Sequence, residues 1–180
     1  MNIELNIAAS KNNIEEVKKL YKKKDLLNVA IAMTAQNGHK ELLEYLLTLE
    51  TTLEDKELGL NEALFYASQN NYLEIVEFLL ANGASFNRKG RTALHAAACW
   101  GNNEIIEKLI NAGMNVNVLD EDDSIPLCEA IVNKRVETVK ILLEKGSNPL
   151  FPDEFGITPK DLALDYGGKE IKKLISIFLK

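Results

Sequence analysis

Cysteine and histidine are scarce in this chain of 180 residues, which contains two of each. The cysteines, Cys99 and Cys128, form no Cys-x-x-Cys spacing, and no cluster of cysteines with histidines occurs. Neither a disulfide framework nor a structural zinc site is therefore supported. We expect two buried or half-buried thiols in a reducing compartment, and no cofactor.

Long apolar runs are also missing, since no stretch approaches the ~20 apolar residues of a membrane-spanning helix. Residues 1–13 lack the basic segment and apolar run of a secretory signal. The net charge of −6 at pH 7 argues against nucleic acid, which favours a basic protein face. We therefore expect a cytoplasmic protein that binds neither membrane nor nucleic acid, although export by a route that the sequence does not show stays open.

Motifs for catalysis and for phosphate binding are absent as well. Neither GxxxxGK[ST] nor GxGxxG occurs, and two histidines offer no partner arrangement for a triad. The acidic run Asp120–Asp123 lacks the alternate ligands and glycine bend of a calcium loop, so we interpret it as a solvated loop tip. The sequence predicts no enzyme, no metal site and no small-molecule substrate.

The chain does contain one sequence motif that occurs six times, with variation between the copies. The clearest copy covers residues 91–117, and the residues equivalent to its leucine are Leu5, Ile31, Leu64, Leu94, Leu127 and Lys160. The steps between them are 26, 33, 30, 33 and 33 residues. A unit of this size cannot bury its own apolar face, so the period predicts a stacked array of repeats.

The fourth copy shows what each unit is built from. Thr92 is placed to cap a helix that begins near Ala93, and Gly101 is placed to end it. Leu94 and Ala97 lie on one apolar stripe of this short helix. The sequence then predicts an antiparallel second helix, whose stripe is formed by Ile105, Ile106, Leu109 and Ile110.

This pattern resembles the ankyrin repeat. The resemblance depends on matches in register, which are Gly38-His39, Glu74-Ile75-Val76, Gly83-Ala84, Leu94-His95 with Ala97-Ala98, Pro126-Leu127 and Gly156-Ile157-Thr158-Pro159. It implies an all-α fold, an ankyrin-repeat solenoid of helix-turn-helix units with short β-hairpin fingers. It also implies a single domain over 1–180, with repeats at approximately 1–26, 27–59, 60–89, 90–122, 123–155 and 156–180.

The two ends of the chain depart from the family pattern. Lys160 replaces the leucine of the sixth repeat, and the first repeat carries a run of lysines. Both end repeats are therefore expected to act as caps with a polar outer face. The final helix is still expected to bury an apolar stripe formed by Ile171, Leu174, Ile175, Phe178 and Leu179.

The resemblance also implies a function. Members of this family are non-enzymatic modules that bind a partner protein through a concave groove, and we expect a monomer. His39 and His95 stand where the family uses histidine to brace loops between repeats. Groove positions that the repeat itself does not need are the candidate binding residues, namely Tyr66, Asn70, Lys89, Arg91, Trp100, Glu121, Asp122, Glu129, Asn133 and Tyr166.

Several alternatives stay open at this point. Trp100, the only tryptophan, is either a binding anchor or a ring that packs flat over a neighbouring helix. The chain as a whole is a protein-binding module, a dedicated inhibitor or immunity-type protein that occludes an enzyme's active site, or a host-directed bacterial effector or targeting piece of a larger protein.

The repeat register can be tested by one substitution. Ala97→Asp is expected to place an unpaired charge between two packed repeats and to lower the free energy of unfolding by several kcal/mol. Thermal melting followed by circular dichroism measures the effect. A melting curve that does not change contradicts the register.

Overall fold

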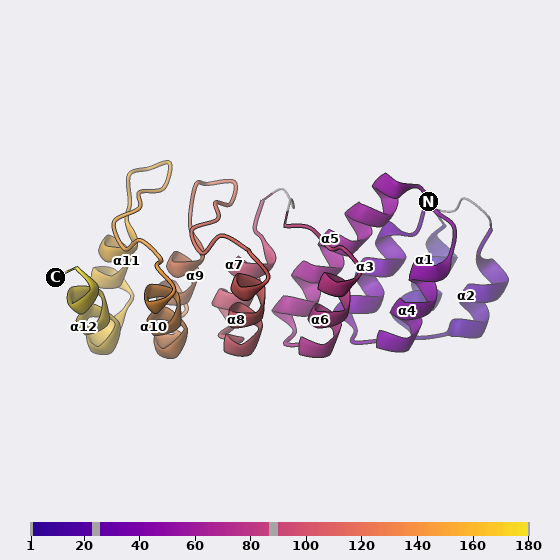
Figure 1. The fold of residues 1–180 in the computed structure, drawn as a ribbon, viewed down its shortest axis with the longest axis horizontal. Coiled ribbons are helices and arrows are strands. Elements are labelled where there is room, and N and C mark those ends of the chain that lie inside the picture. The colour runs from indigo at the N-terminus through magenta and orange to yellow at the C-terminus, as the bar shows by residue number, and fades with distance from the viewer. Residues whose placement is uncertain (1, 23–25, 87–89, 180) are drawn as a thin grey trace. The chain divides into compact units, whose positions relative to one another are not determined.

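A computed structural model describes residues 2–22, 26–86 and 90–179, and over these ranges the chain forms twelve helices and no strand (Figure 1). The chain divides into two compact units, Met1–Arg88 and Lys89–Lys180. Unit 1 contains α1 (Ile3–Ser10), α2 (Ile14–Leu20), α3 (Asn28–Gln36), α4 (Lys40–Thr48), α5 (Leu53–Gln69) and α6 (Leu73–Ala81). Unit 2 contains α7 (Ala93–Trp100), α8 (Asn103–Asn111), α9 (Pro126–Val132), α10 (Val136–Glu144), α11 (Pro159–Asp165) and α12 (Gly168–Phe178).

Each unit is built from three helical hairpins, and within a unit the first helices of successive hairpins pack on one another. In unit 1 the first helices are α1, α3 and α5, and in unit 2 they are α7, α9 and α11. The predicted helix-turn-helix repeat is therefore confirmed. The expectation of a single domain over 1–180 stays a prediction.

A tight turn joins the two helices of a hairpin, and its geometry recurs. The residue seven positions after the repeat leucine has a positive φ, between 56° and 81°, in the first five repeats; these residues are Asn12, Gly38, Asn71, Gly101 and Lys134. Glycine and asparagine adopt this left-handed backbone at low cost. Gly101 ends α7 in this conformation, as the sequence predicts.

The core lies where the first helices meet. Leu94, Ala97 and Ala98 of α7 are fully buried, as are Leu127 and Ala130 of α9. The small alanine side chains let neighbouring helices approach closely while the leucines fill the remaining space. The predicted burial of Leu94 and Ala97 is confirmed.

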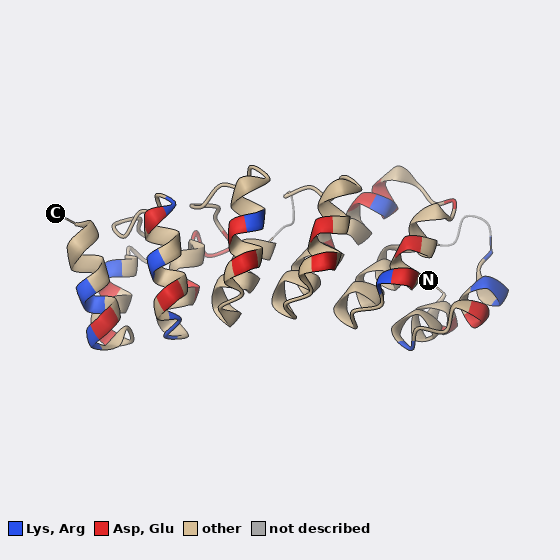
Figure 2. Ribbon diagram, turned by 60° about the horizontal axis from the view of Figure 1, so that its bottom comes forward, with Lys and Arg blue, Asp and Glu red and all other residues tan. Residues whose placement is uncertain are grey.

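In the hairpins α3–α4 and α7–α8, the charged residues lie on the second helix. The first helices α3 and α7 contain no charged residue, whereas the second helices α4 and α8 carry glutamate and lysine (Figure 2). Helix α8, for example, buries Ile105, Ile106 and Leu109 and exposes Glu104 and Glu107. The second helices are therefore amphipathic and face solvent.

The third repeat begins differently from the prediction. Helix α5 has 17 residues, starts at Leu53, and crosses the repeat boundary expected between residues 59 and 60. Thr52 caps this helix, because its hydroxyl accepts a hydrogen bond from the Asp55 N–H at 3.1 Å. A threonine followed by Glu54 and Asp55 in the first turn is a strong helix start, so α5 begins about two turns before the expected start of the third repeat.

The extra turns of α5 provide a cap for the neighbouring repeat. The buried carboxylate of Asp55 accepts hydrogen bonds from the Leu27 N–H at 2.6 Å and the Asn28 N–H at 3.3 Å. It also accepts one from the Thr51 hydroxyl at 2.6 Å. The Leu27 amide belongs to the N-cap residue of α3. The leucine side chain cannot cap the helix by a hydrogen bond. Asp55 therefore satisfies the amide groups at the start of α3.

The fingers of unit 2 are loops in the part of the chain that the structure describes. A backbone hydrogen bond closes each tip: the Asp120 N–H donates to the Ser124 carbonyl at 3.0 Å, and the Asp153 N–H donates to the Ile157 carbonyl at 3.0 Å. The chain thus reverses direction as in a hairpin, but the expected β-strands do not form among the described residues. The side chain of the aspartate at the start of each tip also accepts hydrogen bonds from backbone amides within the tip. These hydrogen bonds favour a turn over paired β-strands.

The final helix buries less of its stripe than the sequence predicts. Ile171 and Ile175 are buried and Leu174 is half-buried, but Phe178 and Leu179 are 41% and 38% exposed. Helix α12 contacts α10 and α11. Phe178 and Leu179 stand at the C-terminal end of α12 and are exposed, so their predicted burial is wrong.

The role of Asp55 can be tested by mutation. Asp55→Ala is expected to lower the free energy of unfolding by about 2 kcal/mol or more, since two amides at the start of α3 lose a buried acceptor. Glu54→Ala, at the exposed neighbouring position, is the matched control and is expected to cost less than about 0.5 kcal/mol. Urea unfolding measures both. Equal midpoints for the two variants would argue against the cap.

Candidate partner-binding site

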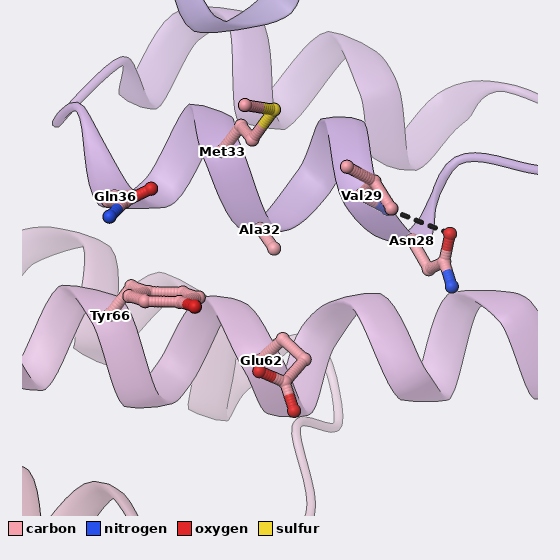
Figure 3. Close-up of a pocket in the computed structure, with 7 residues that line it drawn as sticks. All are labelled: Asn28, Val29, Ala32, Met33, Gln36, Glu62 and Tyr66. Atoms are coloured by element: carbon pink, nitrogen blue, oxygen red, sulfur yellow. Dashed lines mark hydrogen bonds between the residues drawn. The ribbon is translucent and has the colours of Figure 1, made fainter. Parts of the chain in front are cut away.

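A hollow lies between the first helices α3 and α5 of unit 1 (Figure 3). Its volume is about 290 Å³. Helix α3 contributes residues one turn apart on one face, and α5 contributes a pair four residues apart. The lining consists of Asn28, Val29, Ala32, Met33, Gln36, Glu62 and Tyr66.

Apolar side chains form the interior of this hollow and polar ones its edge. Ala32 is buried, and Val29, Met33 and Tyr66 are half-buried. Glu62 is the one ionisable carboxyl group of the lining. The arrangement is suited to an apolar group with a polar or cationic neighbour.

Two contacts hold the α5 wall of the hollow in place. The Tyr66 ring lies edge-on to Phe65, with the ring centroids 5.3 Å apart and the planes at 82°. The Asn70 side chain donates a hydrogen bond to the Gln36 carbonyl at 2.8 Å and joins the ends of α5 and α3. Asn70, predicted to contact a partner, therefore also links two repeats.

The prediction from sequence included Tyr66 but missed the other residues of the hollow. Val29 and Glu62 stand two positions before the repeat leucine, and Met33 and Tyr66 stand two positions after it. These shared positions in the repeat could have indicated the hollow from sequence, because equivalent positions of stacked repeats lie side by side.

Two charged candidates of unit 2 pair with each other. Arg91, just before α7, forms an ion pair with Glu129 of α9. The Glu129 side chain is 14% exposed and the Arg91 side chain 48%. The structure thus brings these two predicted residues together across adjacent repeats, and each already serves as a partner for the other.

The fingertip candidates of unit 2 also have internal contacts. The Glu121 carboxylate lies against Gly90, where an added Cβ would come within 2.9 Å of its oxygen. The Asp122 N–H donates to the Asp120 carboxylate at 3.1 Å, and the Asp122 carbonyl accepts from the Glu154 N–H at 3.2 Å. The two fingers of unit 2 are therefore in contact at their tips.

Three further candidates of unit 2 lie at or just after the C-terminal ends of first helices. Trp100 is 53% exposed and Tyr166 is 50% exposed. The Asn133 side chain donates to the Glu129 carbonyl of its own helix at 2.9 Å. The half-exposed ring of Trp100 leaves a large apolar surface in water, and its role stays a prediction. Lys89, the remaining candidate, lies outside the described residues.

Both histidines link neighbouring repeats, as the sequence predicts. His39 Nε2 lies 3.1 Å from the Ser10 carbonyl oxygen, and His95 Nε2 lies 3.0 Å from the Ser124 carbonyl oxygen. A carbonyl only accepts, so the nitrogen must carry the proton in each case. The bracing role of His39 and His95 is confirmed.

The surroundings of His95 select its neutral form. With Nε2 donating to Ser124, Nδ1 accepts from the Thr92 N–H at 3.3 Å. Burial lowers the pKa of His95 from its ordinary value of 6.5, more than the Ser124 carbonyl and Asp120 raise it, and Arg91 lowers it further. A second proton on Nδ1 would break the contact with the Thr92 amide.

The cysteines are both free thiols, with Cys99 half-buried and Cys128 buried. Burial raises the pKa of the Cys128 thiol, which keeps it protonated and poorly nucleophilic. The predicted burial of the two thiols is confirmed.

No group of three or more histidine, cysteine, aspartate and glutamate side chains in residues 2–22, 26–86 and 90–179 is arranged to hold a metal ion. Within those ranges, no helix has the length and apolar character needed to cross a membrane.

The sequence is similar to known ankyrin repeat proteins. The family described as ankyrin repeats (3 copies) matches residues 5–89 and 64–153. A putative ankyrin repeat protein of Rickettsia bellii is 35% identical over 89 residues, which cover 48% of this chain and 49% of that protein. The putative ankyrin repeat protein YahD of Escherichia coli is 35% identical over 94 residues, which cover 49% of this chain and 47% of that protein.

Larger proteins also contain a similar region. The E3 ubiquitin-protein ligase KEG of Arabidopsis thaliana is 37% identical over 76 residues, which cover 42% of this chain and 5% of the ligase. The matched regions thus span at most about half of the length of these three relatives.

The pKa of His95 leads to a prediction for stability. Because the folded-state pKa is lowered, the unfolded chain binds the proton more tightly. Neutral His95 makes its full contribution to the free energy of unfolding at pH values above the pKa of the unfolded chain. That contribution is lost as the pH falls below the pKa of the unfolded chain. The melting temperature of the wild type should therefore drop more than that of His95→Gln between about pH 7.5 and about pH 5.5. Equal drops in both proteins would contradict the assignment of a neutral His95.

Proposed function

Because the chain belongs to the ankyrin repeat family, we propose that it is a non-enzymatic module that binds another protein through its first helices. Ankyrin repeats in general are protein-interaction modules. In this chain the first helices α3 and α7 carry no charge, whereas the second helices carry the solvated charges. The faces of α3 and α7 therefore lose little by being removed from water.

The hollow between α3 and α5 is the observation that carries this proposal. It is formed by the folded chain alone, and its walls are held by the Asn70–Gln36 hydrogen bond and by the contact between Phe65 and Tyr66. A preformed surface lowers the ordering cost on this side of a complex. A partner side chain can enter without a rearrangement of the repeats.

Exposed aromatic side chains support the same function. Tyr66 lines the hollow of unit 1, and Trp100 and Tyr166 stand half-exposed in unit 2. Tryptophan, tyrosine and arginine are enriched among the residues that dominate binding energies. We take Tyr66 and Trp100 as the anchors of their units, with surrounding contacts from Arg91, Glu121, Asp122, Glu129, Asn133 and Tyr166.

A pull-down experiment with the whole chain tests the function. The wild type is used as bait, partners are identified by mass spectrometry, and the dissociation constant of a purified partner is measured by calorimetry. Tyr66→Ala or Trp100→Ala is expected to weaken binding about thirtyfold, which corresponds to ~2 kcal/mol for a central anchor. Lys18→Ala, on the second helix α2, is the control and is expected to cost under ~1 kcal/mol.

The outcomes separate the possible forms of this function. A partner enzyme that loses its activity at one equivalent of the chain identifies the inhibitor form, and a partner that keeps its activity identifies a recognition module. Affinity that is unchanged in both aromatic variants, at native melting temperatures, would exclude the first helices as the binding face.

A further inference from the structure

We propose that the hollow between α3 and α5 receives one bulky apolar side chain from a partner segment that also carries a neighbouring lysine or arginine. This inference rests on the proposed function and adds the chemistry of the partner. Leucine, methionine and phenylalanine are the anchors that fit it best. The argument has three steps, which concern size, lining and charge.

The size of the hollow suits a single side chain. Its volume of about 290 Å³ is at the lower limit for pockets that enclose a whole drug-sized ligand. Ala32 is buried at its interior, and a larger residue at this position would fill the space. Figure 3 shows Ala32 between the two walls, with the Tyr66 ring and Glu62 facing it from α5.

The lining favours an apolar anchor of variable shape. Met33 and Val29 form the α3 wall, and the Tyr66 ring forms the α5 wall. Methionine is unbranched and polarisable, so it adapts to aliphatic and aromatic side chains alike. The aromatic ring adds a large rigid contact at low entropic cost.

The apolar surface continues along α5 beyond the hollow. Leu58, Glu62 and Tyr66 follow one another at intervals of four residues and so share one side of the helix. Leu58 is 49% exposed. A partner segment with its anchor in the hollow would cover Leu58 with the residues next to that anchor and pass the Glu62 carboxylate on the way.

The charge of these helices selects a basic neighbour for the anchor. The first helices of unit 1 contain one cation, Lys56, while α3 contains no charged residue. The Lys56 ammonium donates to the Leu47 carbonyl at the end of α4, at 3.4 Å. The acidic residues of these helices are Glu4, Glu54, Asp55, Glu57 and Glu62.

The excess of carboxylates on these helices, of which Glu62 lines the hollow, attracts a cationic segment and repels an acidic one. The attraction depends on the sum of these charges and not on any single ion pair, and it acts on orientation and association rate more than on final affinity. The apolar anchor supplies most of the binding energy, and the basic residue sets the direction in which the segment lies.

A library of random 12-residue peptides displayed on phage, panned on the whole chain, tests the inference. Enriched peptides are expected to share a leucine, methionine or phenylalanine with a lysine or arginine within four positions. A synthetic peptide of the enriched sequence is then titrated by calorimetry into the wild type and into Ala32→Leu, Tyr66→Ala and Glu62→Gln. Ala81→Leu, at an exposed position of α6, and Glu44→Gln, at an exposed position of α4, are the matched controls.

The expected effects differ among the variants. Ala32→Leu fills the hollow and should weaken the peptide at least about tenfold, as should Tyr66→Ala, which removes one wall. Glu62→Gln should weaken it about threefold and reduce the dependence of the association rate on salt. Both controls should stay within about twofold of the wild type. Tyr66→Ala keeps the test decisive if Ala32→Leu does not fold.

Other results would overturn the inference. Enrichment of acidic peptides, or of basic peptides without an apolar anchor, contradicts the partner chemistry. An affinity that is the same in Ala32→Leu and Tyr66→Ala as in the wild type shows that the peptide binds elsewhere. Recovery of no peptide above background also rejects this inference. The proposed function is then tested separately, by the pull-down with the wild type and Trp100→Ala.

Discussion

Within each unit, neighbouring helical hairpins cover one another's apolar faces, and the rest of the structure depends on this constraint. Leu94 and Ala97 of α7 are fully buried, as are Leu127 and Ala130 of α9, and these two first helices pack on one another. In the first four repeats the same positions are buried, namely the leucine or isoleucine and the small residues three and four places after it. Tyr66, Trp100 and Met33 stand at other positions of the first helices.

A second constraint is that backbone groups buried where repeats meet require partners. The chain meets it in two ways. His39 and His95 reach the carbonyls of Ser10 and Ser124 in the neighbouring repeat. Asp55, in the extra turns of α5, accepts from the amides at the start of α3. An imidazole N–H thus satisfies a carbonyl at one kind of junction, and a buried carboxylate satisfies amides at another.

These two constraints also explain where binding chemistry is available. Side chains at the junctions are committed to neighbouring repeats: Asn70 bonds to Gln36, and Arg91 pairs with Glu129. Between the junctions, α3 and α5 leave a hollow with apolar walls and Glu62 at its edge. A partner that uses this surface gains apolar burial in the hollow and orientation from charge, because the stacked helices already hold the walls in place.

The sequence by itself determined the repeat, the helix pairs, the buried leucine and alanine positions and the bracing role of the histidines. The repeat, the helix pairs and the buried positions follow from local spacing and from the side-chain types that a stacked unit requires. The bracing role of the histidines and the choice of Tyr66 as a site residue follow from the resemblance to the ankyrin repeat. Only the tertiary structure decided that Asp55 caps α3, that Arg91 pairs with Glu129, and that Val29, Ala32 and Met33 line one hollow with Glu62 and Tyr66. These contacts join residues 27 to 38 positions apart, and no local pattern specifies which side chains meet across two packed helices.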